Sequence, residues 1–499
     1  MPGPWHGAWS VPPRVPPASR SVLLSLLVAL SLVDGSGPVR AEARAGRQRP
    51  GIGRPVTRTR PARRPTRSIR IGRSLRPARR PAATGRLLAT PAASASARLD
   101  LIRSARGEIN TSAYIFGDDR VGRIALAELR AAARTGRRVR LLVDAAGSHL
   151  PRAALAHLLD EGIEVGIYNR FRARKLLRPV SLTYRLHDKL LIVDGEHLVV
   201  GGRNVEEGYF GFSRAGYTHF DDVDAYAHGE PASSANRYFM DLWNGPQVER
   251  LRREDLRVSK RKVARYGEAI DHAGRMTERG RFETFRARWR AEPTVRLDRV
   301  EFVHEDPRTL KNGVARTQRR LLRVIDEAAS EVEIHTPYLV PDRELLGAIA
   351  RARERGVTVR FVTNSLANAR GHELLAQWAY ESQLRSLADA GAEVWEVKGP
   401  RVMHAKTVVA DRRHVYIGSF NMDQRSRRLQ KETGILADSP ELAEQTIRHG
   451  ETLRAGALLA ARAGAVTPLK RRQCGRGCRF FARFVYGPFT RLTGLYGQL

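Results

Sequence analysis

Two stretches of the sequence repeat one arrangement of a histidine, a lysine, an aspartate and a glycine-asparagine element. The spacing in both is His-x-Lys-x4-Asp-x6-Gly-[Gly/Ser]-x-Asn. A histidine can attack phosphorus, a lysine can hold the negative charge of a phosphate, and a second histidine can give a proton to the leaving group. Two copies therefore predict two half-sites that face each other across one phosphodiester. The residues are His187, Lys189, Asp194, Gly201, Gly202 and Asn204 in the first copy, and His404, Lys406, Asp411, Gly418, Ser419 and Asn421 in the second.

Each copy of the motif is typical of a strand, a turn and a return strand. Histidine and lysine are two residues apart, so on a strand both side chains lie on the same face. The aspartates, Asp194 and Asp411, belong to the catalytic motif but fall at the turn, where we expect them to brace the loop. The polar groups after the glycine, on Asn204, Ser419 and Asn421, are predicted to donate hydrogen bonds to phosphate oxygens.

The motif segments HDKLLIVD and HAKTVVAD resemble the paired HKD motifs of the phospholipase D superfamily. The flanking segments GGRNVEEGYFG, GSFNMDQRS and YLVPDRELLGAIARARERGVTVRFVTNSLAN are similar to the bacterial cardiolipin synthase branch of that superfamily. The resemblance covers roughly residues 90 to 455. It implies a pseudo-two-fold arrangement of two halves with a single active site between them.

The resemblance also implies how the site works. His187 would be the nucleophile that forms a covalent phosphohistidine, and His404 would be the general acid and base. The residues alone do not separate these two roles. Each histidine needs a carboxylate on its other ring nitrogen, and the acids expected beyond the motifs are Asp222, with Asp224 as the alternative, and Glu432. We expect no metal and no cofactor, because two lysines supply the positive charge.

Strands and helices alternate on both sides of the chain's middle. Apolar runs with a period of two, rich in Val, Ile and Leu, are separated by helical segments in the same order in both parts. This order predicts an α/β fold built from two duplicated α/β/α layered domains, at residues 91–230 and 318–460. The segment between them, residues 231–317, is charged and predicts a helical connector.

The ends of the chain carry most of the net charge of +35. Residues 1–39 contain a thirteen-residue apolar run and predict a signal or membrane-targeting segment. Residues 40–90 are rich in arginine and proline and predict a disordered linker. Residues 461–499 form a basic, aromatic tail that suits a membrane interface. Its two cysteines, Cys474 and Cys478, lack the further ligands that a zinc site needs.

Four functions fit these residues. We favour a phosphatidyltransferase that makes cardiolipin over a hydrolytic phospholipase D, which has the same motifs but uses water as acceptor. A nuclease would use the arginine-rich arm, yet no nucleic-acid module accompanies it, and a non-catalytic basic protein would tolerate loss of a motif. The expected partners are phospholipid substrates and an anionic membrane surface, with no obligatory nucleic acid. We expect a membrane-associated monomer, an intramolecular pseudo-dimer, at the bacterial inner membrane or its periplasmic face.

Overall fold

The computed structural model describes the two halves that carry the motifs. The described residues are 83–171, 183–212, 219–278, 289, 293–309, 315–368, 373–399, 401–462 and 464–467. The predicted targeting segment (residues 1–39), nearly all of the predicted linker (residues 40–82), and residues 468–499 with both cysteines lie outside them. No helix within the described ranges has the length and apolar character needed to cross a membrane.

The first half is built on an eight-stranded mixed sheet. The strand order is β1-β9-β7-β6-β2-β3-β4-β10, with β2, β3 and β4 parallel and the other pairs antiparallel. The strands are β1 (Ala83–Leu88), β2 (Glu108–Ala113), β3 (Arg138–Asp144), β4 (Glu164–Tyr168), β6 (Lys189–Val193), β7 (His197–Gly201), β9 (Asp224–His228) and β10 (Val248–Arg250).

The second half repeats that order strand for strand, as β11-β19-β17-β16-β12-β13-β14-β20, with β21 added at the edge. The antiparallel pair of β1 and β11 joins the two sheets. The predicted fold class, an α/β fold made of two duplicated domains, is confirmed. The strands are β11 (Val295–His304), β12 (Glu331–His335), β13 (Thr358–Asn364), β14 (Glu393–Val397), β16 (Thr407–Ala410), β17 (His414–Gly418), β19 (Thr433–Asp438), β20 (Leu458–Arg462) and β21 (Ala465–Val466).

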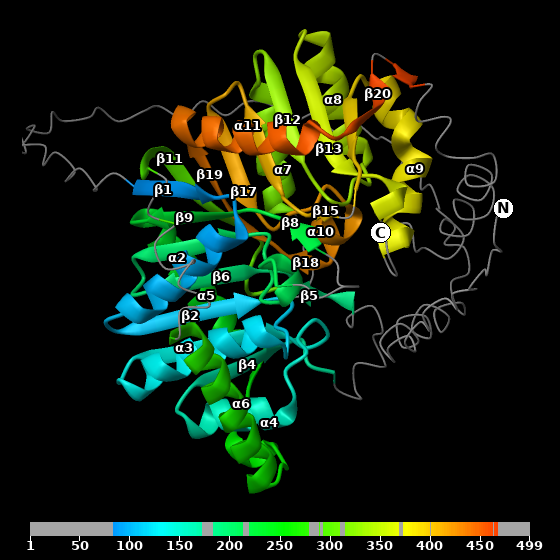
Figure 1. Cartoon of the computed structure of the whole chain (residues 1–499). Helices are drawn as coiled ribbons and strands as arrows, with labels where there is room; N and C mark the ends of the chain where they lie inside the picture. Colours follow the sequence, from blue (N-terminus) through cyan, green and yellow to red (C-terminus); the bar gives the residue numbers. More distant parts are fainter. Residues whose placement is uncertain are drawn as a thin grey trace, which may run out of the picture. The chain divides into compact units, whose positions relative to one another are not determined.

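Helices cover both faces of each sheet (Figure 1). Helices α2, α3, α4 and α6 pack on the outer face of the first sheet, and α7, α8 and α9 on the outer face of the second. Helices α5 and α11 contribute to the largest core cluster, which draws apolar side chains from both halves. The helices are α2 (Pro91–Ser104), α3 (Arg120–Arg134), α4 (Arg152–Asp160), α5 (Glu230–Trp243), α6 (Lys260–Glu278), α7 (Arg316–Glu327), α8 (Arg343–Glu354), α9 (Glu373–Ala390), α10 (Gln424–Arg428) and α11 (Pro440–Arg454).

Two predicted boundaries and the predicted content of the connector need correction. Residues 83–88, assigned to the disordered linker, form the edge strand β1, and residues 461, 462, 465 and 466, assigned to the tail, belong to β20 and β21. The helical connector does contain α5 and α6, but it also contains the ten-residue strand β11. The pairing of β11 with β19 shifts register between Asp298 and Glu301, and Arg299 has a φ of 43°. Such a bulge interrupts the alternation of apolar and polar residues by which a strand is recognised in a sequence.

Two short parallel strand pairs connect the halves directly. In one, β5 (Arg185–Leu186) of the first half pairs with β18 (Gln430–Lys431) of the second. In the other, β8 (His219–Asp221) of the first half pairs with β15 (Arg401–Met403) of the second. The four labels lie together between the two sheets in Figure 1. Because each pair ends next to a motif histidine or a candidate acid, these pairs position the site.

Candidate active site

The pairing of β5 with β18 brings His187 next to an acid of the other half. The register aligns Leu186 with Lys431, and the backbone N–H of His187 donates to the carbonyl oxygen of Lys431 at 2.9 Å. The following residue, Glu432, then lies with its Oε2 and Oε1 at 2.9 and 3.1 Å from Nδ1 of His187. Both side chains are buried.

The second pair repeats this geometry with the halves exchanged. Met403 aligns with Asp221, and the N–H of His404 donates to the carbonyl oxygen of Asp221 at 2.7 Å. Asp222 therefore follows beside the ring, with its Oδ2 at 2.6 Å from Nδ1 of His404. Each histidine thus receives its acid from the opposite half. The alternative acid, Asp224, instead accepts from Arg98 at 3.0 Å.

The two acids favour the same tautomer of both histidines. When Nδ1–H donates to a carboxylate, the unprotonated nitrogen of a neutral ring is Nε2, which can attack phosphorus. Burial lowers the pKa of His187 and His404 well below the usual range, and the charges of Lys189 and Lys406 lower both further. Both rings are therefore neutral near pH 7. The same two lysines lower the pKa of both rings, as expected of one shared site.

The two motif lysines lie beside their own histidines. Nζ of Lys189 donates to the carbonyl oxygen of His187 at 2.7 Å, and Nζ of Lys406 donates to the carbonyl oxygen of His404. Nζ of Lys406 also lies 2.5 Å from Nδ1 of His404 and 3.9 Å from Oδ2 of Asp222. Burial lowers the pKa of Lys189 to about 7 and that of Lys406 to about 8, while the buried carboxylates act to raise them.

The residue after each motif glycine faces the acid of its own half. Ser419 Oγ donates to Oε2 of Glu432, and Ser426 Oγ donates to Oε1 at 2.6 Å. At the matching position of the first half is Gly202, where an added Cβ would lie 2.2 Å from Oδ1 of Asp222. Here the hydroxyl proton of Ser419 is directed to Glu432, and its binding of a phosphate oxygen stays a prediction.

The two motif asparagines differ in the hydrogen bonds that their side-chain amides make within the protein. Asn204 accepts from the N–H of Ile115 at 3.2 Å and donates to the Tyr209 hydroxyl at 2.9 Å. The side-chain oxygen of Asn421 is buried and has no hydrogen-bond partner among the described residues. Since the amide oxygen and nitrogen can exchange places by a flip of the side chain, Asn421 retains hydrogen-bonding capacity for a substrate.

The motif aspartates do not reach the reactive histidines. Asp194 accepts from the backbone N–H groups of Arg106, Gly107 and Glu108, at 2.8, 2.8 and 3.0 Å. Asp411 accepts in the same way from residues 329–331 at 2.8 to 3.1 Å. Both have positive φ, 54° and 50°, at the turn after their strand. Asp194 and Asp411 belong to the catalytic motif, but these bonds brace the loops before β2 and β12, as expected from their place at the turns.

Two polar residues that the sequence analysis did not place in the site hold the reactive segments. Asp144, at the end of β3, accepts from the N–H of Leu186 at 2.9 Å as well as from its own turn. Asn364, at the matching strand end, accepts from the N–H of Met403 at 2.9 Å. Each side chain therefore holds the residue just before a motif histidine, through a hydrogen bond from the backbone N–H of that residue.

Aromatic rings surround the histidines. Tyr114 lies edge-on to His187 at 5.1 Å between ring centroids, while Tyr209, Phe220 and Tyr338 lie edge-on to His404 at 5.2, 5.3 and 6.3 Å. Short-range sequence patterns did not single them out, because an aromatic residue in a strand or loop is usually a core residue.

Two arginines near the motifs, Arg203 and Arg425, differ in the contacts that their guanidinium groups make within the protein. The guanidinium of Arg203 is buried and donates to the carbonyl oxygens of Tyr209, Ala89 and Asp222, so it holds the loop around Asp222. Arg425 is half-buried. Its positive charge adds to the burial that lowers the pKa of His187, and acts against the burial that raises the pKa of Tyr114. Its Nε has no hydrogen-bond partner in the described part of the chain.

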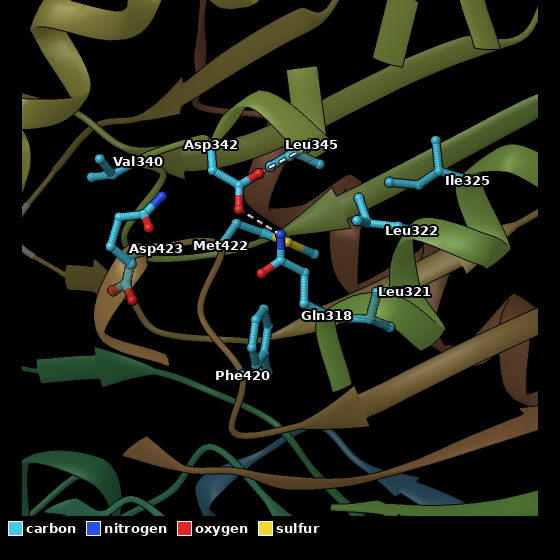
Figure 2. A pocket seen from close by; sticks show the side chains of 11 residues that line it. Gln318, Leu321, Leu322, Ile325, Val340, Asp342, Leu345, Phe420, Met422 and Asp423 are labelled. Carbon is cyan, nitrogen blue, oxygen red and sulfur yellow. Dashed lines mark hydrogen bonds between the residues drawn. The ribbon is translucent and has the colours of Figure 1, made fainter. Parts of the chain in front are cut away.

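Each half also has an apolar cavity in its outer helical layer, near the loops that carry the motif asparagines. The cavity of the first half, between α2 and α3, measures about 80 Å³. Its counterpart between α7 and α8 measures only about 10 Å³ and is shown in Figure 2. There, Gln318 of α7 donates to Asp342 at 2.7 Å, and both side chains line the cavity. Neither cavity is lined by a motif histidine or lysine.

Comparisons with known proteins agree with this architecture. Residues 99–243 and 321–453 match the family model described as "Cardiolipin synthase, PLD-like domain". Cardiolipin synthase C of Escherichia coli (strain K12) is 30% identical over 394 residues, which cover 70% of this chain and 80% of that protein. A cardiolipin synthase of Listeria welshimeri is 27% identical over 337 residues, which cover 66% of this chain and 60% of that protein.

A solved structure shares the fold. The crystal structure of phosphatidylserine synthase from Haemophilus influenzae Rd KW20 superposes with a TM-score of 0.60 at 16% identity, covering 84% of this chain and 98% of that one. The matched model falls once on each half of the duplication and includes both HKD motifs. The chain therefore belongs to the phospholipase D superfamily, in its cardiolipin synthase-like branch.

Proposed function

We propose that this protein is a phosphatidyltransferase that joins glycerophospholipids into cardiolipin through a covalent phosphohistidine. The observation that carries the proposal is the pair of crossed contacts, His187 with Glu432 and His404 with Asp222, around two buried lysines. Two histidines that each have a supporting acid suit one phosphodiester: one ring attacks phosphorus, and the other protonates the headgroup oxygen that leaves. The similarity to cardiolipin synthases favours a phospholipid as that phosphodiester.

In the first step, Nε2 of His187 attacks the phosphorus of the donor lipid. The bond from phosphorus to the headgroup oxygen breaks, and protonated Nε2 of His404 gives its proton to that oxygen. Burial keeps His404 neutral in the free protein, so we infer that the negative charge of the bound phosphodiester raises the pKa of this ring. Lys189, Lys406 and Arg425 offset the charge that develops on the phosphoryl oxygens.

In the second step, His404 takes the proton of the acceptor hydroxyl. The acceptor oxygen attacks phosphorus, the bond to His187 breaks, and the ring leaves as a neutral imidazole. With the hydroxyl of phosphatidylglycerol as acceptor the product is cardiolipin, whereas with water it is phosphatidic acid. The choice of acceptor therefore separates a transferase from a hydrolytic phospholipase D.

We further propose that the protein acts as a monomer on an anionic membrane surface. Its substrates reside in a bilayer, and the basic ends of the chain suit anionic headgroups. The bacterial inner membrane or its periplasmic face is the proposed location. Sedimentation with vesicles that contain or lack phosphatidylglycerol measures the surface preference.

The activity is tested with purified protein in mixed micelles of phosphatidylglycerol and phosphatidylethanolamine, with products identified by mass. Cardiolipin from wild type and from His272→Ala, an exposed histidine on α6, but not from His187→Ala or His404→Ala, is the expected result. Phosphatidic acid alone assigns the protein as a hydrolase. Cleavage of single-stranded DNA without lipid turnover overturns the proposal in favour of a nuclease.

A further inference from the structure

Three potential metal ligands gather at the end of the first sheet that points away from the reactive histidines. Glu196 and His197 lie at the turn between β6 and β7, and His228 ends β9. His197 and His228 are directly opposite each other in the pairing of β7 with β9, with ring centroids 4.9 Å apart. One ligand atom from each of the three side chains lies within 4.8 Å of the other two. Five strand residues, a span of about 17 Å, separate this cluster from the site.

The surrounding structure holds these side chains in place. The N–H of Gly229 donates to the carbonyl oxygen of Glu196 at 3.0 Å, which ties the turn to the end of β9. Nδ1 of His197 lies 2.9 Å from the hydroxyl of Tyr226, so its Nε2 is the nitrogen left for a ligand. Glu196 is exposed and both histidines are half-buried, so an ion from solvent can reach them.

The duplicated half provides a comparison at the same position. There His414 lies opposite Asp438 in the pairing of β17 with β19, and the two form an ion pair. Arg413 stands where the first half has Glu196, at 3.9 Å from Asp438, and Arg299 lies 3.1 Å from the same carboxylate. Cations of the protein therefore occupy this position in the second half. In the first half, no side-chain ion pair or hydrogen bond of Glu196 or His228 is found among the described residues.

We propose that Glu196, His197 and His228 bind a divalent transition-metal ion, with zinc as the best match. Two imidazoles and one carboxylate are the donor set that zinc accepts, and three protein ligands leave a position for water. The bound ion joins the β6–β7 turn to β9, and β9 begins two residues after Asp222. The site is separate from the phosphodiester chemistry and does not depend on the proposed function.

The test uses the full chain with Cys474→Ser and Cys478→Ser as the parent, because thiolates also bind zinc. Zinc chloride is titrated calorimetrically, and bound zinc is counted by elemental analysis after gel filtration. The parent and His414→Ala, the matched control from the second half, should each retain about one more zinc per chain than His228→Ala, since three ligands are needed for a stable site. Equal zinc content in the parent and in His228→Ala overturns the proposal.

A second variant guards against loss of folding. Glu196 is exposed, so Glu196→Gln should fold normally and bind zinc about tenfold more weakly or worse, because an amide replaces a charged ligand. Zinc should also raise the thermal midpoint of the parent and of His414→Ala, but not that of His228→Ala. An unchanged zinc affinity in Glu196→Gln contradicts the assignment of this ligand.

Discussion

The two halves of this protein are alike at the ends of their sheets that face each other and unlike at the opposite ends. At the facing ends, β5 with β18 and β8 with β15 place a histidine, a lysine and an acid in the same relation twice. At the far ends, His197 meets His228 in one half, whereas His414 meets Asp438 in the other. One reaction at a shared site requires the side chains at both facing ends to keep the same arrangement. The side chains at the far ends have only to keep each half folded.

A smaller difference lies within the facing ends themselves. Both lysines donate to the carbonyl oxygen of their own histidine, but Nζ of Lys406 also lies close to the ring of His404 and to Asp222. Ser419 donates a hydrogen bond to Glu432, whereas Gly202 has no side chain and lies directly against the carboxylate of Asp222. The halves are thus similar in arrangement but not equivalent in environment, as two steps with different proton demands would require.

Removal of either histidine should have the largest effect. We expect His187→Ala and His404→Ala each to lower lipid turnover by about 10⁴-fold or more. A nitrophenyl phosphodiester separates their roles, because its leaving group needs no proton. On that substrate His404→Ala should still release nitrophenol in a single-turnover burst, and His187→Ala should not. If His187→Ala showed the burst and His404→Ala did not, His404 would be the nucleophile and His187 the general acid.

Replacement of Glu432 or Asp222, the acids that contact the histidines of the opposite halves, should lower turnover in the same pattern as the histidine variants, but by less. Glu432→Gln and Asp222→Asn should each lower kcat by about 10²- to 10⁴-fold, because the ring loses the group that fixes its tautomer. Asp222→Asn should follow His404→Ala on the nitrophenyl substrate, and Glu432→Gln should follow His187→Ala. If each acid variant instead resembled the histidine variant of its own half, the crossed pairing would be wrong.

The pH dependence should report the two lysines. Burial lowers the pKa of Lys189 to about 7 and that of Lys406 to about 8. Deprotonation removes positive charge as pH rises through these values, so kcat/KM should fall by about tenfold per pH unit from pH 7 to pH 8, and more steeply above pH 8, where both lysines titrate. The lowered pKa of the histidines keeps them neutral, and activity should persist below pH 6.5. An alkaline limb that begins only above pH 10 would contradict shifted lysines.

The two arginines should separate binding from stability. Arg425→Gln should raise KM by about tenfold with little change in thermal midpoint, because its charge lies near His187 and offsets the phosphate. Arg203→Gln should instead lower the thermal midpoint, because three buried carbonyl oxygens lose their donor. Michaelis kinetics and thermal unfolding on both variants measure the difference; equal effects on KM would contradict it.

The motif aspartates should affect activity least. Asp194→Asn and Asp411→Asn should each cost about 1–3 kcal/mol of unfolding free energy through weakened bonds to backbone N–H groups, with kcat nearly unchanged. Burial raises the pKa of both carboxyls, but the N–H donors outweigh it and the net pKa is lowered. Their stabilisation is therefore present above about pH 4 and is lost as pH falls further. Urea unfolding at pH 7 and pH 3 checks this, and a large loss of kcat would restore a direct catalytic role.

Much of the fold followed from local patterns. The strands that carry HDKLLIVD and HAKTVVAD are apolar, β-prone and bounded by turn residues, so their existence and their faces were predictable. Strand β11 was missed because a bulge and charged outward residues hide its period of two. Strand β1 was missed because it continues an arginine-rich stretch.

The sequence by itself determined which reactive groups the protein has: two histidines and two lysines at repeated spacing, each followed later by an acid. It also determined that these groups lie on two copies of one α/β unit. Only the tertiary structure decided which acid serves which histidine, because that pairing depends on β5 meeting β18 and β8 meeting β15, contacts between residues 182 to 245 positions apart. It also decided that Ser419 donates to Glu432 and that Arg203 holds the loop around Asp222. Asp194 binds backbone N–H groups at the end of the sheet away from the histidines. Spacing constrains neighbours along a strand, whereas partners across a fold are chosen by the packing of whole elements.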